Sequence, residues 1–256
     1  MEKQFSRIEL MIGKGRLKRL HQSHVAVIGL GAVGSFCVEA LARSGVGHLT
    51  VVDCDKVEET NLNRQLFALH STIGKKKTDA ARERIVDIYP HCKVRALELF
   101  AHADTISTIL EDKPDLIIDA IDSLNPKVNI LAEISRSGIP VISSMGAATR
   151  TDLGLIRFGD LFSARGCSLA RSVRQRLRRL GITEGIDCVY STEISNKDAL
   201  GEIGEGQMGV DQGRKRRPMG SLPTVTAVFG LTVAHHALRF LLGGSFLEEK
   251  ALRSDF

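Results

Sequence analysis

The sequence predicts an α/β protein with a Rossmann-like, doubly wound, mostly parallel sheet, extended on its C-terminal side by an antiparallel strand and further helices. Two observations lead to this fold class. Short aliphatic runs alternate with helical patterns over residues 24–144, and a glycine-rich turn joins the first run to the first helix. The chain of 256 residues, 43% of them hydrophobic, can bury a sizeable core.

The first crossover unit follows a basic amphipathic stretch at 8–20. Residues 24–28 read as a buried strand, and after the glycine turn a helical pattern runs to residue 44, before a second strand at 48–53. A helix is expected at 77–89, where Pro90 ends it, and then a short strand at 93–97. The alternation continues with a helix at 104–110, a strand at 114–119, a helix at 125–137 stopped by Gly138, and a strand at 140–144.

Beyond residue 146 the alternation ends. We expect an extra, antiparallel strand near 153–158 and an arginine-rich helix at 168–180. Residues 192–222 contain six Gly and the basic cluster 214–217, which is typical of a mobile functional loop. We expect a core at 1–158 and an extension of the same domain at 159–256.

The apolar segment 222–243 approaches the length of a membrane span. It contains His235, His236 and Arg239, and Pro223 suits a first helical turn, so a buried helix is favoured over membrane association. Five cysteines without a CxxC pair argue against disulfides and a four-thiolate zinc site. With charged N-terminal residues and no visible secretory signal, we expect a cytoplasmic protein.

The glycine motif predicts a nucleotide site. Gly29 permits the tight turn, Gly31 lets the backbone approach a phosphate, and Gly34 allows close helix packing. The following helix would offer free N–H groups to the anion, and Asp53 at the end of the second strand would accept ribose hydroxyls. This pattern would serve NAD as well as ATP.

The polar loop after Asp53 favours ATP. Arg64 and Lys77 can neutralise the charge that leaves as pyrophosphate, and Asn61 can orient a phosphate oxygen. Asp122, just past the fourth strand, can hold Mg²⁺ near the triphosphate. Asp55 and Gln65 are the remaining residues of the predicted ATP site.

Five motifs, in order, resemble the ubiquitin-activating-enzyme-like adenylyltransferase superfamily. They lie at 29–34, 51–55, 61–65, 74–77 and 119–122. The resemblance implies that Asp53 binds ribose, that Asn61, Arg64 and Lys77 contact the phosphates, and that Asp122 holds the metal and is needed for adenylation. It also implies a homodimer in which Arg7 reaches the neighbouring subunit's ATP.

The second half is similar to the tRNA threonylcarbamoyladenosine dehydratases, on the segments 165–181, 189–193 and 220–223. That similarity implies adenylation of the nucleoside's free carboxylate and closure of a cyclic oxazolone-type ring with loss of AMP. Six arginines and no acid between 165 and 179 fit a tRNA footprint recognised through phosphate and shape. The predicted tRNA contacts are Arg171, Arg174, Arg178 and Arg179.

Three alternatives stay open. The main one is activation of the C-terminal glycine of a ubiquitin-like sulfur carrier, which shares the adenylation chemistry. The others are an NAD-dependent oxidoreductase and a nucleotide-bound tRNA-binding module without turnover. Cys167 and Cys188 are expected to be small buried residues rather than thioester carriers. Whether a cysteine desulfurase or another sulfur-transfer partner docks is left open.

Overall fold

The computed structural model describes residues 3–201 and 217–246. Its strands form one seven-stranded sheet in the order β3-β2-β1-β4-β5-β7-β6. Neighbouring strands are parallel, except for the antiparallel pair β6 and β7. The strands are β1 (His24–Ile28), β2 (His48–Val52), β3 (Lys93–Leu97), β4 (Leu116–Asp119), β5 (Val141–Ser144), β6 (Ile156–Asp160) and β7 (Asp187–Ser191). The predicted fold class is confirmed.

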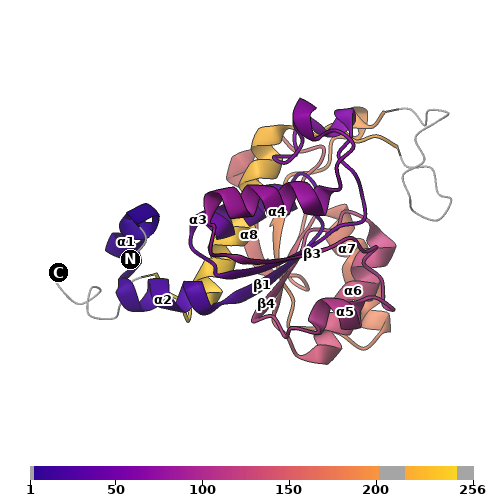
Figure 1. The fold of residues 1–256 in the computed structure, drawn as a ribbon. Helices are drawn as coiled ribbons and strands as arrows, with labels where there is room; N and C mark the ends of the chain where they lie inside the picture. Colours follow the sequence, from indigo (N-terminus) through magenta and orange to yellow (C-terminus); the bar gives the residue numbers. More distant parts are fainter. Residues whose placement is uncertain (1–2, 202–216, 247–256) are drawn as a thin grey trace, which may run out of the picture.

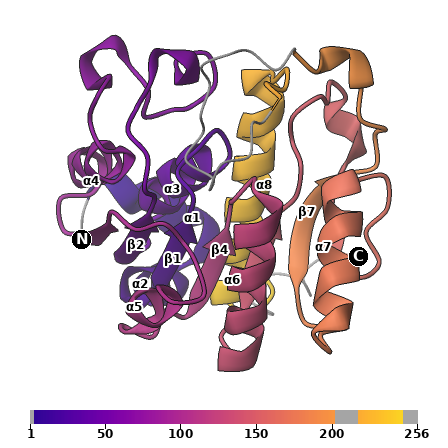
Figure 2. The same ribbon diagram turned by 90° about the vertical axis from the view of Figure 1, so that its right-hand side faces the viewer.

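Two helical layers cover the sheet (Figures 1 and 2). Helices α2, α3, α4 and α8 pack on one face, whereas α5, α6 and α7 pack on the other. Along β1 the side chains alternate between these two hydrophobic cores, as the pleat of a strand requires. The helices are α1 (Ser6–Ile12), α2 (Lys14–Gln22), α3 (Gly34–Arg43), α4 (Lys77–Ile88), α5 (Ile106–Leu110), α6 (Leu124–Ser137), α7 (Ser168–Arg179) and α8 (Pro223–Leu241).

The strand order reverses between β1 and β4. The chain proceeds from β1 outward through β2 to β3 and then returns to the other side of β1, where β4, β5 and β7 follow. In doubly wound sheets, ligands bind outside the carboxyl ends of the strands at such a switch point. The loops that follow β1, β2 and β4 are therefore expected to line a ligand-binding site.

The local predictions agree closely with the observed elements, but two features differ. The N-terminal amphipathic stretch is two helices, because Gly13 between α1 and α2 adopts a φ of 85°. The strand β7 was not predicted, and it lies between β5 and β6 in the sheet. The expected boundary at residue 158 falls within β6, so both parts of the chain contribute strands to the same sheet.

The apolar C-terminal segment forms α8, which packs against α3. A Cβ on Gly230 would lie 2.4 Å from the carbonyl oxygen of Val33, so the two helices approach closely at this glycine. Within the described ranges, α8 is the one helix long and apolar enough to span a membrane, and 44% of its most apolar window is buried. The buried face of α8 includes Phe229 and Val233, which agrees with the expectation of a buried helix.

Part of the predicted loop at 192–222 lies outside the described residues. This part includes Arg214, Lys215 and Arg216 of the basic cluster, whereas Arg217 is described and exposed. Leu200 and Met219, which come before and after these undescribed residues, pair with each other in an isolated antiparallel bridge.

Candidate nucleotide site

The glycine turn after β1 has the geometry of a phosphate-binding turn. Gly29 adopts a φ of 94°, and a Cβ on Gly34 would lie 1.8 Å from the carbonyl oxygen of Gly29. Both positions therefore require glycine for the close approach of strand and helix. At Gly31 the nearest atom to an added Cβ is Nε2 of Gln65, at 4.0 Å. The turn is thus open at Gly31, beside the N-terminus of α3.

Asp53 connects this turn to the loop after β2. Its Oδ2 accepts a hydrogen bond from the backbone N–H of Leu30 at 2.7 Å, and its Oδ1 accepts one from Asp55 N–H at 2.8 Å. Burial raises the pKa of Asp53, although Lys77 and these hydrogen bonds act in the opposite direction. Each carboxylate oxygen has a second lone pair, so Asp53 can still accept a hydroxyl donor.

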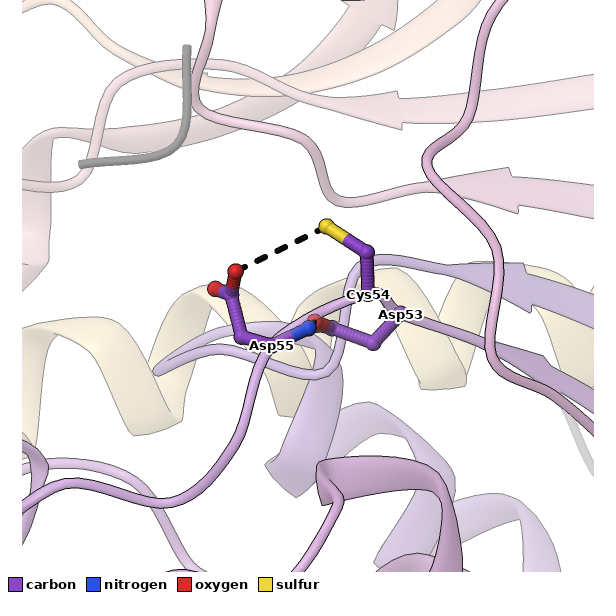
Figure 3. Close-up of side chains that lie close together, drawn as sticks. All are labelled: Asp53, Cys54 and Asp55. Atoms are coloured by element: carbon purple, nitrogen blue, oxygen red, sulfur yellow. Dashed lines mark hydrogen bonds between the residues drawn. The ribbon is translucent and has the colours of Figure 1, made fainter.

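Asp53, Cys54 and Asp55 bring two carboxylates and a thiol within 4.8 Å of one another (Figure 3). The Cys54 thiol donates to Oδ1 of Asp55 at 3.6 Å. Burial, followed by the two neighbouring carboxylates, raises the pKa of Cys54 to about 11. The thiol therefore stays protonated at neutral pH and is a poor metal ligand. The carboxylate oxygens of Asp53 and Asp55 are the kind of ligand that Mg²⁺ prefers.

Lys77 is the buried cation of this site. It is 6% exposed at the start of α4, and its Nζ lies 2.7 Å from Oδ2 of Asp55. Burial alone would lower its pKa, but the charges of Asp53 and Asp55, with a further contribution from Asp122, outweigh burial and raise the pKa. Lys75 and Lys76 instead form surface ion pairs with glutamates, so Lys77 is the member of this lysine run beside Asp55.

The loop that carries Asn61, Arg64 and Gln65 is held against α3. The backbone N–H of Leu66 donates to Ser35 Oγ at 3.1 Å. Asn61 is 7% exposed, and its Oδ1 accepts from the backbone N–H of Glu58. Nη1 of Arg64 donates to Thr60 O at 2.7 Å and Asn63 Oδ1 at 2.9 Å, so its side chain folds over its own loop.

A fully buried polar network, which was not predicted from the sequence, lies under Asp122. Oδ2 of Asp119 accepts from Nζ of Lys127 and from Oγ of Ser143, both at 2.6 Å, and Asp119 and Lys127 have no exposed surface. Oδ1 of Asp119 accepts from Ile121 N–H at 3.0 Å. The network thereby holds the turn that presents exposed Asp122. A lysine eight residues beyond an aspartate at a buried strand end was the available signal.

The structure gathers the predicted nucleotide residues around β1, β2 and β4, but not every predicted cation. Arg7 lies exposed on α1, and within the described part of the chain no hydrogen bond or ion pair joins it to this cluster. On α7, Arg171, Arg178 and Arg179 are exposed, whereas Nη1 of Arg174 donates to the carbonyl oxygens of Leu161 and Ala164. Arg174 therefore also supports the turn before α7.

Cys167 and Cys188 are buried, in keeping with the expected structural role. Burial raises the pKa of Cys188 to about 12, and Sγ of Cys167 accepts from Ala170 N–H at the start of α7. The paired histidines of α8 pack on aromatic rings, with His236 stacked on Phe158 at 3.5 Å between centroids. Burial lowers the pKa of His236 to about 4.

The comparisons with known proteins agree with this geometry. A model of the ThiF family matches residues 4–255. The tRNA threonylcarbamoyladenosine dehydratase of Bacillus subtilis is 41% identical over 242 residues, covering 93% of this chain and 94% of that protein. The molybdopterin-synthase adenylyltransferase of Escherichia coli is 30% identical over 133 residues, only 52% of each chain.

Solved structures give the same result. The E. coli tRNA N6-threonylcarbamoyladenosine dehydratase in complex with ATP superposes with a TM-score of 0.84 at 32% identity, covering 99% of this chain and 97% of that chain. Its complex with AMP gives a TM-score of 0.83 at the same identity. The chain therefore belongs to the ThiF family, within the group of the tRNA threonylcarbamoyladenosine dehydratases.

Proposed function

We propose that this chain is an ATP-dependent dehydratase that adenylates the carboxylate of threonylcarbamoyladenosine in tRNA and cyclises it with release of AMP. The observation that carries the proposal is the extent of the similarity. Two bacterial dehydratases match over more than nine tenths of both chains, whereas the molybdopterin-synthase adenylyltransferase matches over about half. The ATP complex of a structural relative supports the use of ATP.

The residues around the switch point suit the first step. The open turn at Gly31 and the N-terminus of α3 would receive phosphate oxygens, and Asp53 would accept ribose hydroxyls. Lys77, kept charged by the neighbouring carboxylates, and Arg64 would neutralise the departing pyrophosphate. Asp122, with Asp55 nearby, would hold Mg²⁺, which supplies further charge neutralisation.

The second step needs no protein nucleophile. Once the carboxylate is an acyl adenylate, the carbamoyl oxygen of the same side chain displaces AMP and closes the ring. A site that holds these two groups together makes the closure intramolecular, which supplies much of the rate. The protonated Cys54 and buried Cys188 fit a mechanism without a thioester.

The partners follow from the same proposal. We expect tRNA to contact α7 and the segment before α8, and two copies of the chain to form a homodimer in which Arg7 reaches the other copy's ATP. Arg7 is exposed on α1, and Leu10 and Met11 next to it are 87% and 65% exposed, which suits an interface at this helix. A cytoplasmic location fits a tRNA-modifying enzyme.

The decisive experiment is mass spectrometry of nucleosides from tRNA incubated with the protein, ATP and Mg²⁺. Threonylcarbamoyladenosine should lose the mass of one water while AMP is released in equal amount. An unchanged nucleoside, despite demonstrated ATP binding, would contradict the proposal. AMP formation dependent on a small protein with a C-terminal Gly-Gly would then favour activation of a sulfur carrier.

A further inference from the structure

Arg150, in the loop after β5, is a buried cation without a matching acceptor. It is 3% exposed, and its Nε and Nη1 have no hydrogen-bond partner among residues 3–201 and 217–246. The other two buried cations of this sheet edge are paired, Lys77 with Asp55 and Lys127 with Asp119. A guanidinium keeps its charge in proteins, and buried donors without acceptors destabilise the fold. Stability by itself therefore does not explain a buried arginine with these two donors unpaired.

The backbone next to Arg150 is strained and firmly held. Thr149 adopts a φ of 60°, a left-handed conformation that β-branched residues rarely adopt. Its N–H donates to Gly220 O at 2.8 Å, and its hydroxyl lies 2.5 Å from that of Ser195. Strained conformations persist where the surroundings determine them, and they cluster at ligand-binding sites. These two contacts fix the backbone at Thr149, and with it the direction in which the side chain of Arg150 leaves the backbone.

Glu193 interacts with the charge of Arg150 but leaves its Nε and Nη1 without an acceptor. Glu193 accepts hydrogen bonds from the backbone N–H groups of Thr151 and Asp152 and from the Thr151 hydroxyl. These bonds, together with the charge of Arg150, outweigh the effect of burial and lower the pKa of Glu193. Glu193 thus balances part of the charge of Arg150 without supplying a hydrogen-bond acceptor to it.

One short segment links Arg150 to the nucleotide site. Nδ2 of Asn63 donates to Ser221 O at 3.5 Å, and the preceding residue, Gly220, accepts from Thr149. The loop of Arg64 and the loop of Arg150 are thereby attached to consecutive residues. From the other side, Ser143 of β5 donates to Asp119 beneath the turn of Asp122. Arg150 therefore belongs to a loop after β5 that is linked to the candidate site through Gly220 and Ser221.

We propose that Arg150 binds an oxyanion of the tRNA substrate, either the carboxylate that is activated or a backbone phosphate beside the modified nucleoside. A guanidinium binds carboxylate and phosphate oxygens through charge-assisted hydrogen bonds, and an oxyanion that reaches this loop would supply an acceptor to Nε or Nη1, which have none among the described residues. Arg150 is then a substrate-binding residue on the acceptor side of the reaction, whereas Arg64 and Lys77 serve ATP. This inference rests on the proposed function.

The test compares Arg150→Gln with Arg157→Gln, a matched control. Arg157 is exposed on β6 and donates to the backbone carbonyl oxygens of Gly154 and Ile156. We expect Arg150→Gln to raise the KM for threonylcarbamoyladenosine-containing tRNA about tenfold or more, because it removes a charge-assisted hydrogen bond. The KM for ATP should stay unchanged, and Arg157→Gln should behave like the wild type.

Two further measurements distinguish the outcomes. Binding of the same tRNA without the threonylcarbamoyl group identifies the oxyanion: a loss confined to modified tRNA indicates the carboxylate, and an equal loss for both indicates a phosphate. Without substrate, Arg150→Gln should have a Tm equal to or above that of the wild type, because an unsatisfied buried charge is removed.

A lowered Tm with an unchanged KM and unchanged tRNA binding would overturn the inference and make Arg150 a structural cation. An enzyme with no turnover of modified tRNA would contradict the proposed function instead. In that case the tRNA-binding comparison between Arg150→Gln and Arg157→Gln still tests Arg150 by itself.

Discussion

Buried ionisable groups differ in charge between the two edges of the parallel sheet, the carboxyl edge, where the strands end, and the amino edge, where they begin. At the carboxyl edge, charges are kept: Lys77 is paired with Asp55, Lys127 with Asp119, and Arg150 carries its charge without a hydrogen-bond acceptor. At the amino edge, the rings of His24 and His48 stack at 3.6 Å between centroids. Burial, and then the charge of His48, lowers the pKa of His24 to about 4.

The difference follows from what each edge contacts. The backbone N–H of His24, rather than its ring, donates to Asp115, and the ring nitrogen Nε2 pairs with the Thr50 hydroxyl at 2.8 Å. A neutral ring between strands needs no counter-charge, and with its lowered pKa the His24 ring is neutral at physiological pH. The carboxyl edge carries the loops of the candidate site, where a charged substrate would meet these cations. Burial therefore removes the charge of His24, whereas the carboxylates beside Lys77 outweigh burial and keep its charge.

The largest expected effect is on stability at the carboxyl edge. Lys127→Met would leave the fully buried Asp119 without its cation, and we expect a loss of about 3–5 kcal/mol in the free energy of unfolding. Urea denaturation measures this loss. In the double variant Asp119→Asn with Lys127→Met, both charges are removed, and much of the loss should be recovered. A single variant as stable as the wild type would show that the pair is not needed.

The next effect is on catalysis at the same edge. Asp122→Ala or Arg64→Ala should reduce AMP formation at least about a hundredfold, because each removes charge stabilisation from the adenylation step. Neither side chain is buried, so the Tm should be unchanged. Asp104→Ala, which alters an exposed acid elsewhere, is the control. Normal turnover in either variant would disprove the assignment of that residue.

At the amino edge we predict a dependence on pH. The lowered pKa of His24 means that the unfolded chain binds a proton first as the pH falls from about 6.5 to about 4. The free energy of unfolding should therefore decrease through this window, by an amount on the order of 2 kcal/mol. Denaturation curves at several pH values measure it. His24→Gln should flatten the dependence, leaving the contributions of His48, His235 and His236, whose pKa values are also lowered. An equally steep curve would rule out His24 as a source.

The smallest predicted effect concerns α7, which runs between the two edges. Its first residues lie beside Gly146 at the carboxyl edge, and its last residues lead to the start of β7 at the amino edge. Reversing the charges of Arg178 and Arg179 should weaken tRNA binding about tenfold at low salt and spare ATP binding. Arg171→Glu tests the other end, and Arg174 is left intact because it supports the preceding turn. Unchanged salt-dependent affinity in both variants would exclude α7 from the tRNA footprint.

Much of the fold was predictable because its signals are local. The aliphatic runs, the prolines and glycines that end helices, and the turn at Gly29 act within a few residues of themselves, and the expected strands and helices match the structure. The strand β7 was missed, since its short segment becomes a strand by pairing with both β5 and β6. Which lysine of the run 75–77 lies beside Asp55 likewise depends on tertiary packing, and in the structure it is the buried Lys77.

By itself, the sequence determined the doubly wound fold, the glycine turn and the acids and cations that follow the strands, because these depend on spacing along the chain. Only the tertiary structure decided which buried charges are satisfied. Lys127 meets Asp119 and Ser143 because α6 and β5 both pack beside β4, and Arg150 meets no acceptor among the described residues. Burial and pairing are properties of contacts between distant segments, and these contacts exist only once the sheet and its helical layers have assembled.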